Sequence, residues 1–231
     1  MKRDVLESVL AARRERQARV LVSRLDGGNQ HLLAPDDMAP DHPLAEAVAE
    51  CLRSGRSRTL RTDEGETFLQ ALLPKPRLLI VGATHIAQVL IRLAKEMEFD
   101  VCIVDPRTAF ASPERFPDVE LVAEWPEEAL GRLGLDRRTA VVTLGHEPTI
   151  DDEALIAALA SDCFYIGALG SKRTHASRVE RLTGKGLAAA EIDRIDGPVG
   201  LPIGASGPAE IALSIMAKII AELRRPEDSL D

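Results

Sequence analysis

The sequence predicts an α/β protein in which a doubly wound, mostly parallel sheet follows a small N-terminal α+β domain. Residues 78–81 and 101–104 are short apolar runs without alternation, which is typical of strands buried on both faces of a parallel sheet. Between them, apolar residues recur at helical spacing from His85 onward, so one face of a helix packs onto the sheet. Because parallel neighbours need a crossover connection, strand, helix and strand form one βαβ unit.

The turn that leads into this helix departs from the glycine pattern of dinucleotide-binding turns, G-x-G-x-x-G. Gly82 ends the first strand, but Thr84 and Ala87 stand at the second and third glycine positions. A Cβ at the second position crowds a bound pyrophosphate, so we expect weak dinucleotide affinity. Asp105 ends the second strand, where a carboxylate can accept a hydrogen bond from a ribose hydroxyl. We therefore expect Asp105, and not Arg107, to contact any adenosine ribose.

Residues 1–73 predict a separate α+β domain. The sequence Asp26-Gly27-Gly28-Asn29 between two short runs is a hairpin signal. Pro74-Lys75-Pro76 is a stiff, non-helical connector, so we place the second domain at residues 74–231. The predicted elements are a helix over 3–17, strands over 19–25 and 30–33, a helix from Asp41 to 52, and strands over 57–62 and 67–73 around Glu64-Gly65.

After Asp105, strands and helices alternate along the chain, as in α/β proteins. Pro126 and Pro208 each open a helix, because proline fits the first helical turn. Asp151 and Asp152 fall at the start of another helix, where carboxylates stabilise the helix end without any chemical role. The predicted strands span 121–122, 140–144 and 164–169, and the predicted helices begin at Pro126 or span 151–159, 171–182 and 208–223.

Composition and charge argue against several classes of function. The net charge is −8 and aromatic residues make up 3% of the chain, so nucleic-acid binding is disfavoured. Cys51, Cys102 and Cys163 have no C-x-x-C spacing and are expected to be small buried side chains. The N-terminal sequence is too charged for a signal sequence, and no apolar run is long enough to span a membrane. We therefore expect a cytoplasmic location.

Open parallel sheets bind ligands beyond the carboxyl ends of their strands, so the candidate site residues are those that follow the predicted strands. The segment Gly170–His175 combines a glycine turn, a hydroxyl group and two cations at a helix start, which are the components of an anion or phosphate site. The alternative is a capped, solvated basic helix, since Arg178, Arg181 and Lys185 continue the charge along it.

Two histidines lie in turns after predicted strands. His146 is a candidate for ligand contact, as a general base or a metal ligand. His85 either contacts a ligand or caps a helix. We assign no residue a catalytic role and no residue a metal-binding role.

We predict the working site in a groove between Gly82–His85, His146 and Ser171–His175. Lys172 and Arg173 are expected to hold a phosphate-bearing ligand there, because local positive charge stands out against a net acidic domain. The cofactor-binding candidates are Gly82, Thr84, His85, Asp105, Arg107, His146, Gly170, Ser171, Lys172, Arg173 and His175.

Six runs of sequence, taken together, resemble the xanthine dehydrogenase accessory factor family, also called the XdhC/CoxI family. They are LLIVGATHIAQVL, VDPRTAFASPERFP, EWPEEAL, IDDEALIAAL, YIGALGSKRTHASR and PVGLPIGASGPAEIALSI. The resemblance covers residues 74–224, and the longest of these runs make chance similarity improbable. It implies a Rossmann-like fold for this part of the chain.

The resemblance also implies a non-catalytic, dimeric factor that binds molybdenum cofactor, assists its sulfuration and delivers it to xanthine dehydrogenase or a related molybdenum hydroxylase. The N-terminal part of this family normally has a glycine-rich segment with a cysteine before Leu-Glu. Residues 1–73 lack that segment, because Cys51 stands in Glu50-Cys51-Leu52 without the glycines. Near His146, the family pattern Leu-Thr-His-Asp-Pro is replaced by Leu-Gly-His-Glu-Pro.

Two further functions stay open: an NAD(P)-dependent oxidoreductase on the same fold, and a nucleotide-sensing Rossmann protein whose small domain reports occupancy. A dehydrogenase needs an open pyrophosphate turn, which Thr84 disfavours. A carrier needs an anion cradle, which Lys172 and Arg173 favour. The expected ligand is therefore molybdenum cofactor or NAD(P).

Overall fold

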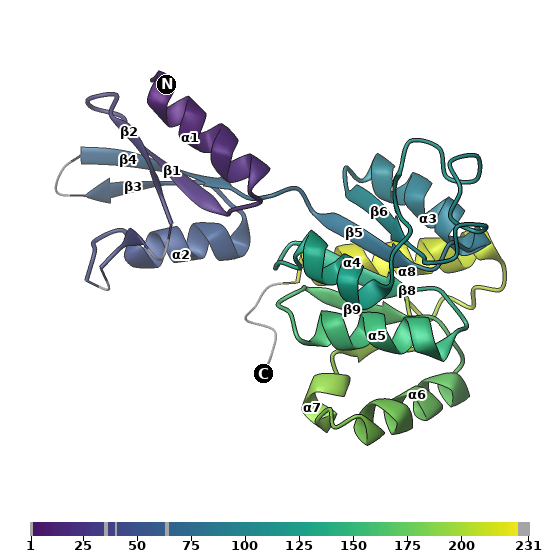
Figure 1. Ribbon diagram of the computed structural model, residues 1–231. Helices are drawn as coiled ribbons and strands as arrows, with labels where there is room; N and C mark the ends of the chain where they lie inside the picture. Colours follow the sequence, from purple (N-terminus) through teal and green to yellow (C-terminus); the bar gives the residue numbers. More distant parts are fainter. Residues whose placement is uncertain (1, 35–36, 40, 63–64, 226–231) are drawn as a thin grey trace. The chain divides into compact units, whose positions relative to one another are not determined.

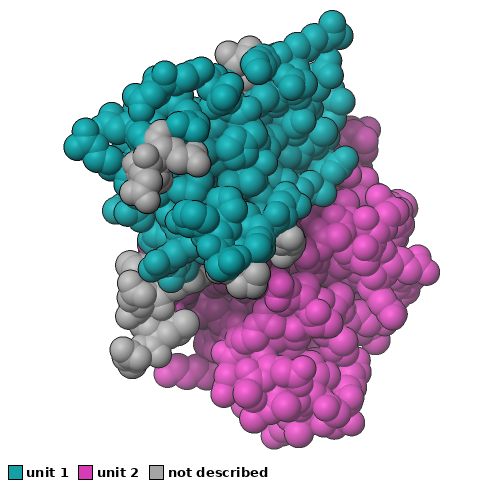
Figure 2. All heavy atoms as spheres, turned by 90° about the vertical axis from the view of Figure 1, so that its left-hand side faces the viewer, with its two compact units in different colours: residues 1–75, 226–231 teal, residues 76–225 magenta. Residues whose placement is uncertain are grey.

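A computed structural model describes residues 2–34, 37–39, 41–62 and 65–225 of the chain. These residues divide into two compact units, and the division falls between Lys75 and Pro76. Unit 1 comprises the described residues up to Lys75, and unit 2 comprises residues 76–225; Figure 2 colours them teal and magenta. Each unit contains one sheet of its own.

Unit 1 is an antiparallel sheet with two helices, the predicted α+β organisation. Its strands lie in the order β2-β1-β4-β3. Helix α2 packs on the sheet through Val48 and Cys51, which share a small core with Val20, Val22 and Leu69. The elements are α1 (Arg3–Arg14), β1 (Arg19–Arg24), β2 (Gln30–Leu33), α2 (Ala45–Ser54), β3 (Arg58–Thr62) and β4 (Gly65–Leu72), as Figure 1 labels them.

Some boundaries in unit 1 differ from the predicted ones. Helix α2 begins at Ala45, and Asp41 does not cap it, because Leu44 holds the N-cap position and donates its amide to His42 Nδ1 at 3.1 Å. Helix α1 ends at Arg14, since Arg16 adopts a positive φ of 54°. Of the predicted turn Glu64-Gly65, Glu64 lies outside the described residues.

Unit 2 is built on a six-stranded sheet in which all neighbouring strands are parallel. The order β10-β9-β8-β5-β6-β7, renumbered along the chain, is the 3-2-1-4-5-6 order of a Rossmann fold. Leu78 pairs with Val101 in parallel register, which confirms the predicted βαβ unit. The elements are β5 (Arg77–Val81), α3 (His85–Glu96), β6 (Asp100–Val104), β7 (Glu120–Val122), α4 (Pro126–Leu133), β8 (Thr139–Thr143), α5 (Pro148–Leu159), β9 (Tyr165–Ala168), α6 (Lys172–Gly184), α7 (Ala189–Ile192), β10 (Ile195–Asp196) and α8 (Pro208–Leu223).

Side chains of this sheet alternate between two apolar cores, one on each face. Leu78 and Ile80 pack in one core with residues of α3 and α8. Leu79 and Val81 pack in the other core with residues of α4, α5 and α6. Figure 1 shows these two groups of helices on opposite faces of the sheet. The central strands are therefore covered on both faces, which explains why they are apolar without alternation.

The sequence did not predict two short elements of unit 2, α7 and β10. Four residues and two residues are too few to give a periodic pattern, although β10 adds a parallel edge strand beside β9. The other boundaries agree within three residues; α5, for example, begins at Pro148 and not at Asp151. Among the described residues, no helix combines the length and the apolar character needed to cross a membrane.

Candidate functional site

The strand order places a topological switch point between β5 and β8, because the chain proceeds from β5 toward β6 on one side and from β8 toward β9 on the other. The turns after these two strands touch. Gly82 has a φ of +106°, and a Cβ on it would lie 2.9 Å from the backbone nitrogen of Gly145. Glycine is therefore required at Gly82 by both backbone conformation and space.

Thr84 has a structural role at the turn. It is the N-cap residue of α3, and its hydroxyl accepts a hydrogen bond from the Ala87 amide at 3.3 Å. The side chain that replaces the second glycine thus begins the helix, as threonine commonly does. The expectation that Thr84 also weakens dinucleotide binding stays a prediction.

Asp105 is fully buried at the end of β6, and both of its carboxylate oxygens are occupied. The Ala83 amide donates to Oδ2 at 2.9 Å. The guanidinium of Arg107 spans both oxygens with two hydrogen bonds of 2.9 Å, and the Arg107 amide donates to Oδ1 at 3.0 Å. Burial raises the pKa of Asp105, but the hydrogen bonds from Arg107 and Ala83 outweigh burial and hold the pKa below its usual range.

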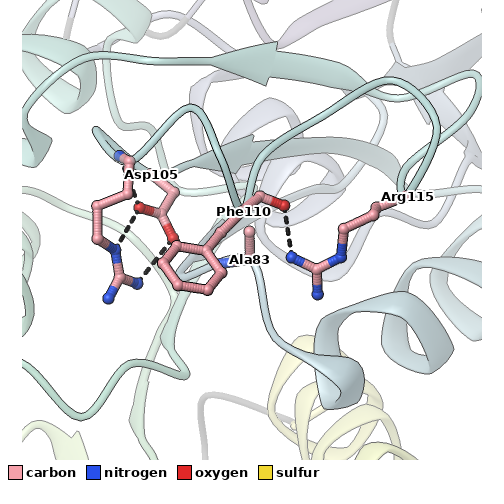
Figure 3. A network of polar contacts seen from close by, with 5 residues as sticks. Ala83, Asp105, Phe110 and Arg115 are labelled. Carbon is pink, nitrogen blue, oxygen red and sulfur yellow. Dashed lines mark hydrogen bonds and ion pairs between the residues drawn. The ribbon is translucent and has the colours of Figure 1, made fainter.

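These hydrogen bonds bear on the prediction that Asp105 contacts a ribose. The sequence suggests that Asp105 accepts from a ribose hydroxyl, but the side chain is enclosed and its oxygens already accept four hydrogen bonds. The group that reaches solvent is the guanidinium of Arg107, whose side chain is 37% exposed. Figure 3 shows the carboxylate of Asp105 with its hydrogen bonds. A ribose could reach Asp105 only after Arg107 moved away.

The start of α6 has a well-defined cap. Gly170 has a φ of +147°, and a Cβ there would lie 2.9 Å from the Thr174 side chain. Ser171 is the N-cap residue and accepts from the Thr174 amide at 3.1 Å. Lys172 and Arg173 are exposed, and neither side chain makes a hydrogen bond or an ion pair with any described residue. This turn therefore presents two available cations.

Of the three cations that the alternative prediction placed on a solvated face, Arg178 and Arg181 are bonded within the protein, while Lys185 is exposed. Arg178 is only 2% exposed, and its Nη2 donates to the Leu169 carbonyl at the end of β9 at 2.7 Å. Arg181 makes two hydrogen bonds, of 2.8 and 2.9 Å, with the carboxylate of Asp152 on α5. The sequence contained a signal for this: Arg178 precedes the buried Leu182 by four residues, so the two share a helix face.

Asp151 and Asp152 are buried, unlike ordinary carboxylates at a helix start. Both lie on α5 and are less than 5% exposed. Burial, together with the charge of Asp152, raises the pKa of Asp151 to about 6, although the charge of Arg178 opposes this shift. A buried carboxyl group with a strongly perturbed pKa at the ligand-binding edge of a sheet marks a candidate functional residue. Sequence reasoning missed it, because the spacing alone placed both aspartates in a first helical turn.

Several buried polar atoms near the ends of β8 and β9, or on the helices that follow them, lack a hydrogen-bond partner among the described residues. They are Thr143 Oγ1, Asp151 Oδ1, His175 Nδ1, and Nε and Nη1 of Arg178. A buried polar group without a partner costs about 1–3 kcal/mol, and such groups normally bind ordered water or a ligand. These atoms mark the polar part of the candidate site.

The three candidate histidines differ in position. His85 and His146 are exposed, and no described hydrogen bond joins either of them to the other candidate residues. The ring of His175 lies directly against Gly197 after β10, since a Cβ on Gly197 would overlap His175 Nδ1. Burial lowers the pKa of His175, and the nearby charge of Arg178 lowers it further.

The cysteines offer no accessible sulfur. Cys51, Cys102 and Cys163 are buried and free, as predicted. Burial raises the pKa of each thiol, to about 12 for Cys102, so none is a ready thiolate at neutral pH. The described residues of the site therefore fit an anionic or hydrogen-bonding ligand better than a thiolate-bound metal.

Comparison with known proteins gives a family and several relatives. A family model described as the XdhC Rossmann domain matches residues 78–219. A protein of Bacillus subtilis described as a probable subunit of xanthine dehydrogenase is 35% identical over 160 residues, which are 68% of this chain and 46% of that protein. The molybdenum cofactor insertion chaperone PaoD of Escherichia coli is 32% identical over 157 residues, which are 68% of this chain and 43% of that protein.

A solved structure is also similar. The crystal structure of a xanthine dehydrogenase from Bacillus halodurans matches 98% of this chain and 65% of its own chain, with a TM-score of 0.66 and 27% sequence identity. This chain therefore spans less than half the length of the two curated relatives and about two thirds of the solved one.

Proposed function

The chain belongs to the family of XdhC Rossmann domains, and on that premise we propose that it is an accessory factor in the maturation of a molybdenum hydroxylase. In this role it binds molybdenum cofactor or a nucleotide and assists sulfuration or insertion of the cofactor into a client of the xanthine dehydrogenase type. The names of two relatives, one an insertion chaperone and the other part of a dehydrogenase, support the proposal. A cytoplasmic location and a homodimeric state are parts of the same proposal.

The observation that carries the proposal is the pair of available cations at the start of α6. Lys172 and Arg173 follow a glycine turn at the carboxyl end of β9, where a Rossmann sheet binds its ligands. Their side chains are exposed and free of carboxylate partners among the described residues, so a ligand phosphate meets no internal competitor. Molybdenum cofactor supplies the metal and sulfur chemistry, and the residues of this chain supply the binding site for its phosphate.

Two kinds of group that could take part in turnover of a ligand are inaccessible, which favours a role in holding it. Asp105 is enclosed by Arg107 and Ala83, and the cysteines are buried, so neither supplies an accessible base or thiolate. An NAD(P)-dependent oxidoreductase is the alternative that the strand order favours, because the 3-2-1-4-5-6 sheet is the dinucleotide-binding one. A nucleotide-sensing protein would use the same sheet.

The test replaces both cations and measures maturation of a client. The Lys172→Ala/Arg173→Ala variant, co-expressed with a molybdenum hydroxylase, is expected to lower the active fraction of that enzyme. Mass spectrometry of the variant purified natively from a molybdate-supplied host is expected to show less bound ligand. Loss of these charge-assisted bonds should cost a few kcal/mol of affinity, about 1.5–3 for each.

The matched control removes two other exposed cations, with Arg92→Ala/Lys185→Ala, and should leave both readouts unchanged. Normal client activity and normal bound ligand in the Lys172→Ala/Arg173→Ala variant would show that α6 carries only a solvated basic turn. The proposed site would then be wrong.

A further inference from the structure

The loop after β6 presents an aromatic ring to solvent. Phe110 is 47% exposed, although aromatic residues make up only 3% of the chain. A single exposed apolar side chain needs no explanation by itself, and Trp125 is exposed to a similar extent. Two features distinguish Phe110 from an ordinary exposed side chain: the guanidinium of Arg107 lies over its ring, and hydrogen bonds hold its backbone.

One face of the Phe110 ring is covered by a cation of fixed orientation. The guanidinium carbon of Arg107 lies 4.8 Å from the ring centroid. Arg107 cannot rotate freely, because two of its nitrogens donate to the buried carboxylate of Asp105. The same carboxylate accepts from the Ala83 amide and so ties this group to the turn after β5.

The backbone that carries the ring is held from two sides. The Phe110 amide donates to the Arg107 carbonyl at 2.9 Å, and Arg115 Nη1 donates to the Phe110 carbonyl at 2.7 Å. The loop is anchored by Phe116, which is 2% exposed, and by Gln88 of α3, which donates to the Arg115 carbonyl. Figure 3 shows the hydrogen bond from the Arg115 guanidinium to the Phe110 carbonyl. A ring held in this way loses little conformational freedom when a ligand stacks on it.

Charge distinguishes Arg107 from the two cations at the start of α6. Arg107 is paired with Asp105, and the carboxylates of Glu147 and Asp151 also act on it. The charge of Arg107 is therefore compensated by carboxylates, whereas Lys172 and Arg173 have no carboxylate partner among the described residues. An uncharged planar ring suits an aromatic face and a neutralised guanidinium.

We propose that Phe110, backed by Arg107, is the stacking subsite for the planar heteroaromatic ring of the ligand, either a purine base or a pterin. This inference rests on the proposed function, since it concerns the ring of the same ligand whose phosphate is proposed to bind Lys172 and Arg173. The ring of the ligand stacks at the end of β6, and its phosphate is bound at the end of β9.

The test compares probes with and without a ring by calorimetry, using ADP, neopterin and inorganic pyrophosphate on the full chain. Phe110→Ala and Phe110→Leu are expected to weaken ADP or neopterin binding about tenfold, because base stacking is typically of that size, and to leave pyrophosphate binding unchanged. Phe110→Trp is expected to retain or raise the affinity. Phe110 is the residue to change, because replacing Arg107 would strand the buried Asp105 carboxylate.

The two ring probes distinguish the two candidate rings. If Phe110→Ala weakens the binding of ADP, the ring of the ligand is a purine; if it weakens the binding of neopterin, the ring is a pterin. Equal affinities of the parent and Phe110→Ala for both ring probes would overturn the inference. Failure of the parent to bind either ring probe would also overturn it. The client-maturation assay with Lys172→Ala/Arg173→Ala does not depend on either of those results. Failure of the stacking subsite is therefore distinguishable from failure of the proposed function.

Discussion

Replacing Asp151 with asparagine should make unit 2 more stable at neutral and alkaline pH. Asp151 is 4% exposed, and its pKa is raised from 3.8 to about 6, chiefly by burial. A shift of about 2 units corresponds to about 3 kcal/mol of unfavourable ionisation in the folded state. Asparagine has nearly the same shape and no charge, so the variant avoids this cost.

The sign of the pH dependence follows from the direction of the shift. Because the folded state holds the proton more tightly than the unfolded state, Asp151 costs nothing below pH 3.8, costs more as the pH rises toward 6, and costs a constant amount above it. The stability advantage of Asp151→Asn should therefore be about 3 kcal/mol at pH 8 and about half of that at pH 5.

The measurement is urea denaturation at both pH values, followed by fluorescence of Trp125, the single tryptophan, which lies in unit 2. Asp152→Asn is the matched control, since Asp152 is equally buried but is bonded to Arg181. It should lower the stability by about 1 kcal/mol or more through loss of that charge-assisted pair. A less stable Asp151→Asn at pH 8 would show that attraction to Arg178 outweighs desolvation, and the reasoning would be refuted.

Two further predictions concern the turn after β5. Gly82→Ala should destabilise unit 2 by a few kcal/mol, about 1–3 of them from backbone strain alone, because φ is +106° and the added Cβ would lie 2.9 Å from the Gly145 nitrogen. Urea denaturation measures this loss of stability. Unchanged stability would mean that the turns after β5 and β8 separate easily. Calorimetry with NAD and NADP should show binding weaker than micromolar, because Thr84 adds a side chain where the pyrophosphate approaches. Submicromolar affinity for either nucleotide would show that Thr84 is no obstacle.

The fold of unit 2 could be predicted because its signals are local and repeated. Buried strands without alternation have to be covered on both faces, and helices of apolar periodicity between them impose parallel order. The two elements that escaped prediction, α7 and β10, are too short to carry any period. In unit 1, a local hydrogen bond between His42 and Leu44 moved the start of α2 away from the capping residue that the sequence suggested.

The site could be predicted only in part, because a sequence gives the position of a side chain along the chain but not its partner. Gly82, Gly170 and Ser171 have backbone roles that follow from residue type, and the structure places all three in turns after strands. The sequence presents Asp105 and Arg107 as competitors for one ribose, whereas they bond to each other. The burial of Asp151 depends on how α5 and α6 pack, which its place in a first helical turn does not reveal, and the burial of Arg178 was signalled only by its spacing from Leu182.

We expect the charge along the carboxyl edge of the sheet to orient a bound ligand. At β6 the cation of Arg107 is neutralised, near the middle Asp151 adds a carboxyl group, and at β9 Lys172 and Arg173 are unpaired among described residues. A reversed ligand would place its phosphate beside a cation already paired with Asp105 and would leave Lys172 and Arg173 without an anion, so we expect the opposite orientation. Strands β5 and β8 separate the two ends, which are thus roughly 14 Å apart at about 4.8 Å per strand. A natural ligand whose binding is weakened by both Phe110→Ala and Lys172→Ala/Arg173→Ala must therefore be extended, with its ring and its terminal phosphate well separated.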